Sequence, residues 1–323
     1  MADTYFTIII PAYNEAEHIR RCIESLKTND NKKIKYEIIV VDNGSTDGTV
    51  EIVRELGIRI IENTEGQRKS IGTLRNIGAR VSRSDILAFL DADIIVPDNL
   101  LQIAQKYFCD GFKGALGLIV NVPSSAGWVG RIWGNPLRLN RDKVINVDFL
   151  TGRNIFINRD VFERIQGFNE ILITGEDKDL TFRVLRAGFR AISVPDVAVV
   201  HLGYDKSLWV FLKKEFWRQG SSLQLAKQWG FSFRTLRNPI LSCWHILLLF
   251  MIILSILYLN IPFTLSLIFI WIFPSAFLTF STAGLKRPFT FLLPLFFLTF
   301  LRWNISGLAL FVQLLRGIPF RNG

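Results

Sequence analysis

The sequence predicts an α/β domain with a mainly parallel sheet, followed by a tail embedded in a membrane. Two observations predict the domain. Short apolar runs rich in β-branched residues alternate with amphipathic stretches, and each run is apolar throughout, as in strands that are covered on both faces. A third observation predicts the tail, because the end of this 323-residue chain is basic, rich in phenylalanine and interrupted by few charges.

The expected strands and helices alternate between residue 6 and about residue 200. Strands are expected at Phe6–Ile10, Tyr36–Val41, Ile58–Ile61 and Ile86–Leu90, with helices at Glu15–Leu26, Thr49–Leu56 and Gly72–Val81. Ligands of such sheets bind in the loops at the carboxyl ends of the strands. We therefore expect the functional site after Ile10, Val41 and Leu90.

The charge is distributed unevenly along the chain. The formal net charge is +10, yet the first 215 residues hold 29 cations against 28 anions, and the remainder holds nine cations and no anion. Half of the residues are hydrophobic, which excludes an intrinsically disordered protein. The balanced first part excludes a uniformly basic nucleic-acid binder, and the basic, apolar end indicates a membrane.

Cysteine usage and the first residues predict where the α/β domain resides. The three cysteines lie far apart with no C-x-x-C spacing, so neither a zinc site nor a disulfide framework is expected. The first apolar run ends at Pro11 and is too short for the core of a signal peptide. We therefore expect this part of the protein to stay in the reducing cytoplasm.

Three parts are expected along the chain. The α/β domain covers residues 1–206, amphipathic interfacial helices cover 207–238, and a membrane domain covers 239–323. The middle part mixes tryptophan, phenylalanine, lysine and arginine, a composition that suits the headgroup region of a bilayer. An ordinary domain edge is the alternative interpretation of this middle part.

The membrane domain is expected to begin with a helical hairpin over residues 241–283. Leu241–Ile261 and Phe263–Ala283 contain no charged residue, and each is long enough to cross a hydrocarbon core of ~30 Å. Cations flank both open ends of the hairpin. The positive-inside rule therefore places these ends, and the α/β domain, on the cytoplasmic side of the inner membrane.

The segment 289–315 is expected to form a third crossing, although Arg302 and Asn304 interrupt it near its middle. A re-entrant or interfacial helix is the alternative, because a third crossing would leave Arg316 and Arg321 outside. A lone charge in lipid is costly, so Arg302 must face protein or an anionic headgroup.

Polar motifs follow the expected strands where ligand loops belong. They are Pro11–Glu15 (PAYNE), Asp42–Gly48 (DNGSTDG) and Asp91–Asp93 (DAD). Neither G-x-G-x-x-G nor a P-loop occurs, so no dinucleotide or P-loop site is predicted. Two carboxylates two residues apart at a strand end suit a hard divalent cation. In isolation, however, two aspartates that merely cap a loop and the next helix are the favoured interpretation.

Four motifs in order resemble those of inverting family 2 glycosyltransferases with the GT-A fold. They are FTIIIPAYNE at 6–15, VVDNGSTDGT at 40–49, Arg75-Asn76 followed by Asp91–Asp93, and Gly175–Asp177. The resemblance covers about residues 5–220. The tail resembles that of bacterial members that build exopolysaccharides and lipid-linked glycans.

The resemblance implies a donor site and a metal. The implied donor-binding residues are Pro11, Ala12, Tyr13, Glu15, Asp42, Arg75, Asp91, Ala92 and Arg218. Asp42 would accept a hydrogen bond from the base, and Arg75 would meet the diphosphate. Asp93, with Asp91 and His201, would hold Mg²⁺ or Mn²⁺. A structural role for His201 is equally open.

The resemblance also implies the catalytic groups. Asp177 would be the base that takes the proton of the acceptor hydroxyl, and Glu176 would orient it or the acceptor. A helix-capping acidic cluster is the alternative. The strand carrying Gly152, Arg153 and Asn154 would face the sugar and the acceptor.

The function implied is a membrane-bound glycosyltransferase that moves a single sugar, with inversion, from a nucleotide-sugar, expected to be a UDP-sugar, to a lipid-linked saccharide. The expected partners are that donor, a polyprenyl-linked glycan and membrane lipids, without nucleic acid. Residues 216–220 depart from the Q-x-x-R-W motif of processive synthases, which favours single transfers. A polyprenyl-phosphate glycosyltransferase and a non-catalytic nucleotide-sugar-binding subunit are the alternatives.

Overall fold

The fold consists of two units in a computed structural model of the chain. The model describes residues 5–28, 34–134, 143–218, 225, 229, 233–283 and 287–316. We call the first the sheet unit; it comprises Met1–Pro123, Leu139–Leu172 and Glu176–Tyr204. The second, the helical unit, comprises Ser124–Arg138, Ile173–Gly175 and Asp205–Gly323.

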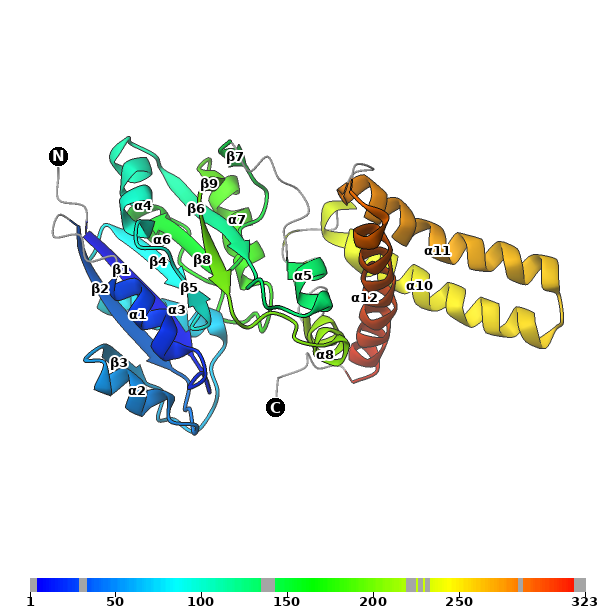
Figure 1. The fold of residues 1–323 in the computed structure, drawn as a ribbon, viewed down its shortest axis with the longest axis horizontal. Helices are drawn as coiled ribbons and strands as arrows, with labels where there is room; N and C mark the ends of the chain where they lie inside the picture. The colour runs from blue at the N-terminus through cyan, green and yellow to red at the C-terminus, as the bar shows by residue number, and fades with distance from the viewer. Residues whose placement is uncertain are drawn as a thin grey trace. The chain divides into compact units, whose positions relative to one another are not determined.

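One mixed sheet organises the sheet unit (Figure 1). In spatial order its strands are β3 (Arg59–Glu62), β2 (Lys35–Asp42), β1 (Tyr5–Ala12), β4 (Ile86–Leu90), β8 (Asn154–Asn158), β6 (Gly114–Asn121), β9 (Arg190–His201) and β5 (Ile94–Ile95), and β7 (Ile145–Asn146) pairs with β9. The first four are parallel, as are β6 and β9, while β8 runs antiparallel to both of its neighbours. The mainly parallel α/β fold predicted from the sequence is therefore confirmed.

Helices cover both faces of this sheet, as Figure 1 shows. They are α1 (Ile19–Lys27), α2 (Thr49–Glu55), α3 (Ile71–Val81), α4 (Leu100–Cys109), α6 (Arg159–Arg164) and α7 (Glu176–Arg186). Alternate side chains of a strand point to opposite faces. Accordingly, Ile8 and Ile10 of β1 belong to the core under α1, α2 and α4, whereas Ile9 belongs to the core under α3, α6 and α7.

The first helix begins four residues later than expected. The sequence pattern predicts a helix from Glu15, but α1 begins at Ile19. The N–H groups of Glu15 and Ala16 donate to Thr49 Oγ1 (2.8 Å) and Asp47 Oδ2 (3.0 Å) of the neighbouring loop. This stretch of backbone therefore braces two loops, a use that apolar periodicity does not reveal.

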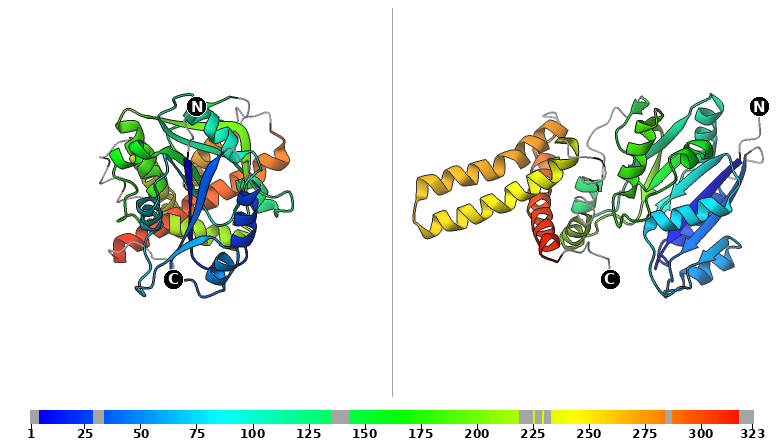
Figure 2. Two further views of the ribbon diagram at one scale, coloured as in Figure 1. Left: turned by 90° about the vertical axis from the view of Figure 1, so that its left-hand side faces the viewer. Right: turned by 180° about the vertical axis from the view of Figure 1, so that it is seen from behind.

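The helical unit contains α5 (Trp128–Gly134), α8 (Leu208–Arg218), α10 (Phe233–Leu257), α11 (Ile261–Ala283) and α12 (Phe289–Arg316). The hairpin expected over residues 241–283 is formed by α10 and α11. By length and composition, α10, α11 and α12 could each cross a membrane. Figures 1 and 2 show α12, in red, running across the yellow and orange hairpin rather than alongside it.

Two further expectations bear on this unit. Of the expected interfacial stretch 207–238, α8 and the start of α10 are described, and most of residues 219–232 lie outside the described residues. Helix α5 comes from inside the stretch expected to form the α/β domain, yet it belongs to the helical unit. Its Val129 is buried against Phe211 of α8 and Leu298 of α12.

Candidate active site

The site is built where parallel strands end on one edge of the sheet. Ala12 and Asp42 are register partners at the ends of β1 and β2. The Asn43 N–H extends this pairing by donating to the Ala12 carbonyl at 2.9 Å. Asp91 follows β4, which pairs with β1 from the other side. The three motifs thus meet at this edge, as the strand-end rule requires.

The loops after β1 and β2 are joined to each other by hydrogen bonds. The Asn14 N–H donates to Ser45 Oγ at 2.8 Å, and the Asn14 side-chain oxygen accepts from the Thr46 N–H at 2.9 Å. Asn14 adopts a positive φ of 53°, a conformation that asparagine tolerates. Pro11 and Ala12, the last two residues of β1, are buried. The loops implied to hold the nucleoside are therefore preformed.

Asp42 organises its own loop. Its carboxylate is 1% exposed, and Oδ2 accepts hydrogen bonds from the N–H groups of Gly44 and Ser45, both at 2.9 Å. Oδ1 accepts a further hydrogen bond from the Ser45 hydroxyl, and a carboxylate has lone pairs beyond these three bonds. The expected contact with the base stays a prediction.

Tyr13 is covered by a cation that sequence reasoning missed. The Arg68 guanidinium stacks over the Tyr13 ring, 3.8 Å from its centroid, and also donates to the Tyr13 hydroxyl. Arg68 lies in the basic loop between β3 and α3, and the only sequence signal for it is its position after a strand of the predicted sheet. This loop brings positive charge to the Tyr13 side of the site.

Arg75 of α3 ties two carboxylates together inside the sheet unit. Its side chain is 1% exposed. Nη2 donates to Asp91 Oδ1 at 2.9 Å and to the Gly152 carbonyl at 2.8 Å, and Nη1 donates to Glu176 Oε1 at 2.8 Å. The expected contact of Arg75 with a diphosphate stays a prediction, whereas the observed contacts give it a positioning role.

Gly152 allows this close packing. A Cβ at Gly152 would lie 2.9 Å from Arg75 Nη2 and 3.0 Å from Nη1. The Gly152 N–H donates to Asp177 Oδ2 at 2.9 Å, so the same residue contacts both sides of the acidic cluster. Arg153, the next residue, is partly buried, and its carbonyl accepts from the Asp91 N–H at 3.2 Å.

Asp93 and His201 form a pair with the donor chemistry of a metal site. Asp93 Oδ2 lies 3.2 Å from His201 Nε2, and both side chains are largely buried. Asp93 Oδ1 is buried and has no hydrogen-bond partner among the described residues. Ala92, between the two aspartates, is buried in the core. Asp91, the third expected ligand, contacts Arg75 instead, and the described residues contain no group of three ligating side chains.

Gly203 leaves room for this pair, which sequence reasoning also missed. A Cβ at Gly203 would lie 1.9 Å from Asp93 Oδ2 and 3.2 Å from His201 Nε2. The Leu202 N–H donates to the Asp93 carbonyl at 2.8 Å and fixes the two segments together. In the sequence, the only hint is a glycine two residues beyond His201.

Electrostatics separate the carboxylates of the site. Burial raises the pKa of Asp91, outweighing Arg75, which lowers it. Burial acts in the same direction on Asp93, but the hydrogen bond and charge of His201 outweigh it, so the pKa of Asp93 is lowered. Burial and the charge of Asp177 raise the pKa of Glu176 to about 7, despite the contact with Arg75.

The acidic motif at the start of α7 divides into distinct roles. Asp177 is half-buried, and its carboxylate accepts from the N–H groups of Gly152 and Lys178. Glu176 is buried against Arg75. Asp179 is fully buried and pairs with Arg183 of the next helical turn at 2.6 Å. Asp179 therefore holds the helix together, while Asp177 keeps partial exposure.

Two expected ligand residues have partners inside their own units. The Asn154 side chain is buried, accepts from the Leu118 N–H at 2.5 Å and braces β8 against β6. We therefore assign Asn154 a structural role. Arg218 lies in the helical unit, where it pairs with Glu215. A contact of Arg218 with the donor stays a prediction.

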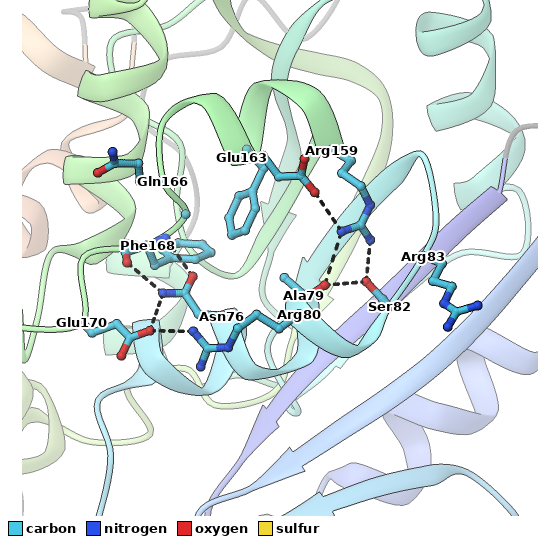
Figure 3. Close-up of a pocket in the computed structure, with 12 residues that line it drawn as sticks. Asn76, Ala79, Arg80, Ser82, Arg83, Arg159, Glu163, Gln166, Phe168 and Glu170 are labelled. Carbon is cyan, nitrogen blue, oxygen red and sulfur yellow. Dashed lines mark hydrogen bonds and ion pairs between the residues drawn. The ribbon is translucent and has the colours of Figure 1, made fainter.

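A pocket of about 820 Å³ lies elsewhere on the sheet unit, between α3 and α6 (Figure 3). Two of its cations are engaged: Arg80 pairs with Glu170 at 3.2 Å, and Arg159 contacts Glu163 at 3.5 Å. None of the expected site residues lines it, so size alone does not identify the active site here.

Comparison with known sequences identifies this architecture. Residues 7–166 match the family described as "Glycosyl transferase family 2". Glycosyltransferase AglE of Haloferax volcanii is 29% identical over 219 residues, 66% of this chain and 71% of its own length. Succinoglycan biosynthesis protein ExoA of Rhizobium meliloti is 25% identical over 213 residues, and the beta-monoglucosyldiacylglycerol synthase of Synechocystis is 25% identical over 236 residues. The alignments span 64% and 49% of the last two relatives.

Solved structures share the fold. The mannosyltransferase PcManGT from Pyrobaculum calidifontis, in complex with GDP-Man and Mn²⁺, superposes with a TM-score of 0.59 at 22% identity, over 96% of this chain and 86% of its own. GalNAc-T7 with UDP, GalNAc and Mn²⁺ gives a TM-score of 0.54 at 18% identity, over 63% and 44%. The sheet unit of this chain therefore has the GT-A fold, and the match over residues 7–166 is to glycosyltransferase family 2.

Proposed function

We propose that the protein transfers a single sugar from a nucleotide-sugar donor to a lipid-linked saccharide, with inversion, at the cytoplasmic face of the inner membrane. One observation carries this proposal. The Arg75 guanidinium contacts both Asp91, next to the Asp93–His201 pair, and Glu176, next to Asp177. A pair suited to a metal and a pair suited to proton transfer are thus held in one network.

The residues present fit a divalent metal. Asp93 and His201 supply a carboxylate and an imidazole, Asp93 Oδ1 has no other partner among the described residues, and Gly203 leaves the space open. Mg²⁺ or Mn²⁺ held there would neutralise charge on the departing diphosphate. The Mn²⁺ in the structures of PcManGT and GalNAc-T7 supports this assignment. Asp91 is bound by Arg75, so we place it second to Asp93 and His201.

Asp177 is the group that we assign as the base. The acceptor oxygen forms its bond to the anomeric carbon as the bond from that carbon to the diphosphate breaks, and the hydroxyl proton moves to the Asp177 carboxylate. A single displacement of this kind inverts the anomeric configuration. The Gly152 N–H orients Asp177. Glu176, with its raised pKa, acts on Asp177 through position and charge rather than as the base.

The donor is proposed to be a nucleoside diphosphate sugar held by the loops after β1 and β2. The crossed hydrogen bonds at Asn14 and the buried Asp42 make these loops rigid before any ligand binds, which lowers the entropic cost of binding. We keep the UDP-sugar as the working donor. The complex of PcManGT with GDP-Man makes a GDP-sugar the first alternative.

The proposed acceptor is lipid-linked because the chain carries three long apolar helices beside its family 2 domain. A glycolipid synthase and an exopolysaccharide biosynthesis protein among the relatives support a substrate at the membrane. Transfer directly to a polyprenyl phosphate is the enzymatic alternative. A non-catalytic nucleotide-sugar-binding subunit would need the same donor site but no base.

Replacing Asp177 with Asn tests the proposal. The Asp177→Asn side chain keeps the size and the contact with Gly152 but has no basic oxygen, so transfer should fall at least ~10³-fold. Donor affinity, measured by calorimetry with Mn²⁺, should stay within about twofold of the original value. As a matched comparison, Asp93→Ala should abolish metal-dependent donor binding. Loss of donor binding in Asp177→Asn would remove Asp177 from the role of base.

A further inference from the structure

Helix α12 packs against two short helices through its middle. Leu298 is buried together with Phe211 of α8 and Val129 of α5. The rings of Trp133 and Phe211 meet edge to face, 5.0 Å apart, in the same cluster. The middle of α12 must therefore lie at the same depth relative to the membrane as α5 and α8.

Charge accompanies this contact. Arg302 of α12 lies 3.3 Å from Glu215 of α8, and its guanidinium sits over the rings of Trp133 (5.5 Å) and Trp303 (5.1 Å). Glu215 is 1% exposed and also pairs with Arg218. The expectation that Arg302 faces protein is thus met by a specific carboxylate.

Helix α8 is too charged for the interior of a bilayer. Besides Glu215 and Arg218 it carries Lys213 and Lys214. If α12 crossed the membrane, residues near Arg302, at the centre of its apolar stretch, would lie at the bilayer midplane, and α8 would lie there too. Each charged side chain costs about 2.5–3.5 kcal/mol at that depth. The contact with α8 therefore argues against a crossing.

The face of α12 opposite Leu298 and Arg302 is exposed and apolar toward both ends, whereas its middle, at Phe300 and Asn304, packs on the α10–α11 hairpin. Its exposed large side chains are Phe289, Leu293, Phe297, Leu308, Phe311 and Leu315. Their spacing by multiples of three and four residues puts them on one side of the helix, away from the side that carries Leu298 and Arg302. A helix with such a face lies in the interface and buries this face ~5–10 Å below the headgroups.

Neighbouring residues suit the same depth. Trp128 of α5 and Trp209 of α8 are exposed, and Lys213 lies 5.2 Å from the Trp209 ring. Exposed indole rings next to cations are typical of the headgroup region. Figures 1 and 2 show α12 running across the hairpin of α10 and α11, the arrangement expected when one element lies in the membrane plane and the other enters the bilayer.

The remaining length of the hairpin is sufficient to cross. Asn304 of α12 meets His245 of α10 at 3.4 Å, which marks the level where the helices pass each other. From His245 to the tip at Leu259, helical geometry gives about 21 Å. Adding ~5–10 Å for the depth of α12 brings the tip close to the far side of a ~30 Å hydrocarbon core.

We propose that α12 binds the surface of the bilayer as an in-plane helix, on the side of the sheet unit, and that the α10–α11 hairpin is the crossing element of the described residues. Helix α8 begins seven residues after the end of β9, a strand of the sheet unit. This connection is too short to cross the bilayer, so α8, and with it α12, lies on the side of the membrane that holds the sheet unit. The chain end after α12 then stays on that side, and Arg316 obeys the positive-inside rule. The proposal does not depend on the proposed sugar transfer.

Cysteine accessibility tests the proposal on the full chain. Cys109 is exposed on α4, Cys22 is buried, and Cys243 is removed as Cys243→Ala. In sealed vesicles in which Cys109 reacts with a membrane-impermeant maleimide, an added Asn322→Cys should react equally. Tyr258→Cys at the hairpin tip should react only after detergent is added. Protection of Asn322→Cys would overturn the in-plane assignment, and reaction of Tyr258→Cys would overturn the crossing of the hairpin.

Depth measurement provides a second, independent readout. In a background that also carries Cys109→Ser, nitroxides are placed at Phe297→Cys on α12 and Phe250→Cys on α10, two exposed phenylalanines. Oxygen and nickel accessibilities should place the label at 297 about 5–10 Å below the phosphates and the label at 250 near the midplane. Equal depth at both positions would contradict an in-plane α12.

Discussion

At the residue scale, the contacts of Asp93 differ from those of Asp91 because a glycine lies against the Asp93 carboxylate. Gly203 faces the Asp93 carboxylate so closely that a methyl group would overlap Oδ2. Asp91, in contrast, is held by Arg75. Asp91 and Asp93 therefore differ in their contacts because their neighbours differ, and their positions in the motif alone do not predict this.

Gly203→Ala should weaken metal binding without unfolding the protein. The added Cβ moves Asp93 Oδ2 and breaks its contact with His201, so we expect the Kd for Mn²⁺ to rise at least ~10-fold, or about 1.4 kcal/mol. Manganese titration by calorimetry or electron paramagnetic resonance measures this change. Gly127→Ala is the matched control, because a Cβ there meets only the Lys206 carbonyl at 3.6 Å. An unchanged Kd in Gly203→Ala would remove Asp93 from the metal site.

Glu176 should impose a pH dependence on stability. Its pKa is raised from 4.5 to about 7, chiefly by burial. Between these values the folded protein binds a proton that the unfolded chain has lost, so the free energy of unfolding falls as pH rises from about 4.5 to 7 and is then level for this group. Glu176→Gln should remove that decline. Denaturant unfolding in detergent across pH 4.5–8 measures it, and identical pH profiles for both proteins would contradict the assignment.

Much of the site was predictable at this scale, but its contacts were not. Polar motifs after apolar strands locate Asp42, Asp91 and Asp93, because the ends of parallel strands meet at one edge. The partners of Arg75 are 16 and 101 residues away in the chain, and no local pattern encodes such a contact. The sequence likewise did not reveal the contact between the Asn154 amide and β6, so Asn154 was predicted to contact the sugar.

At the scale of elements, one carboxylate adds an ionic contact to the apolar packing between α8 and α12. Glu215 contacts Arg218 on its own helix and Arg302 on α12. Because Glu215 is buried, its negative charge is stable only beside the positive charges of Arg218 and Arg302. Glu215 in turn compensates the charges of these two arginines.

Glu215→Gln should destabilise the helical unit by about 3 kcal/mol, since it leaves Arg302 beside tryptophan rings without its counter-ion. Thermal unfolding in detergent checks the sign and rough size. Arg302→Gln should be destabilising as well, and the double variant should lose less than the sum of the two, by at least about 1 kcal/mol. Additive losses would show that the two residues do not interact.

The parallel strands were easier to predict than the antiparallel ones. β1, β2 and β4 alternate with helices and have continuous apolar sequences, so their type and their positions along the chain follow from local patterns. β8 lies between β4 and β6 only because distant segments pair, and helix α5 is too short and too mixed in composition to indicate its partner. Pairings of this kind depend on the packing of the whole core.

At the scale of the whole molecule, a GT-A domain that matches glycosyltransferase family 2 is followed in the chain by helices long and apolar enough to cross a membrane. The sequence predicted both parts, because charge and hydropathy change together after Glu215. It favoured a crossing for α12 and left an interfacial helix as the alternative. That choice depends on what the middle of α12 contacts, and Glu215 is 87 residues away from Arg302 in the chain.

We propose that this protein transfers a sugar to a lipid acceptor with the help of a metal. The most direct test is nucleotide release by the detergent-solubilised full chain, with UDP-, GDP- and dTDP-sugars, Mn²⁺ or Mg²⁺ and a native lipid extract, and with the Asp177→Asn variant as the matched control. We predict release that needs one donor, the metal and the lipid together and that is absent in the variant. Tight metal-dependent nucleotide binding without release from any donor would contradict the claim and indicate a binding subunit.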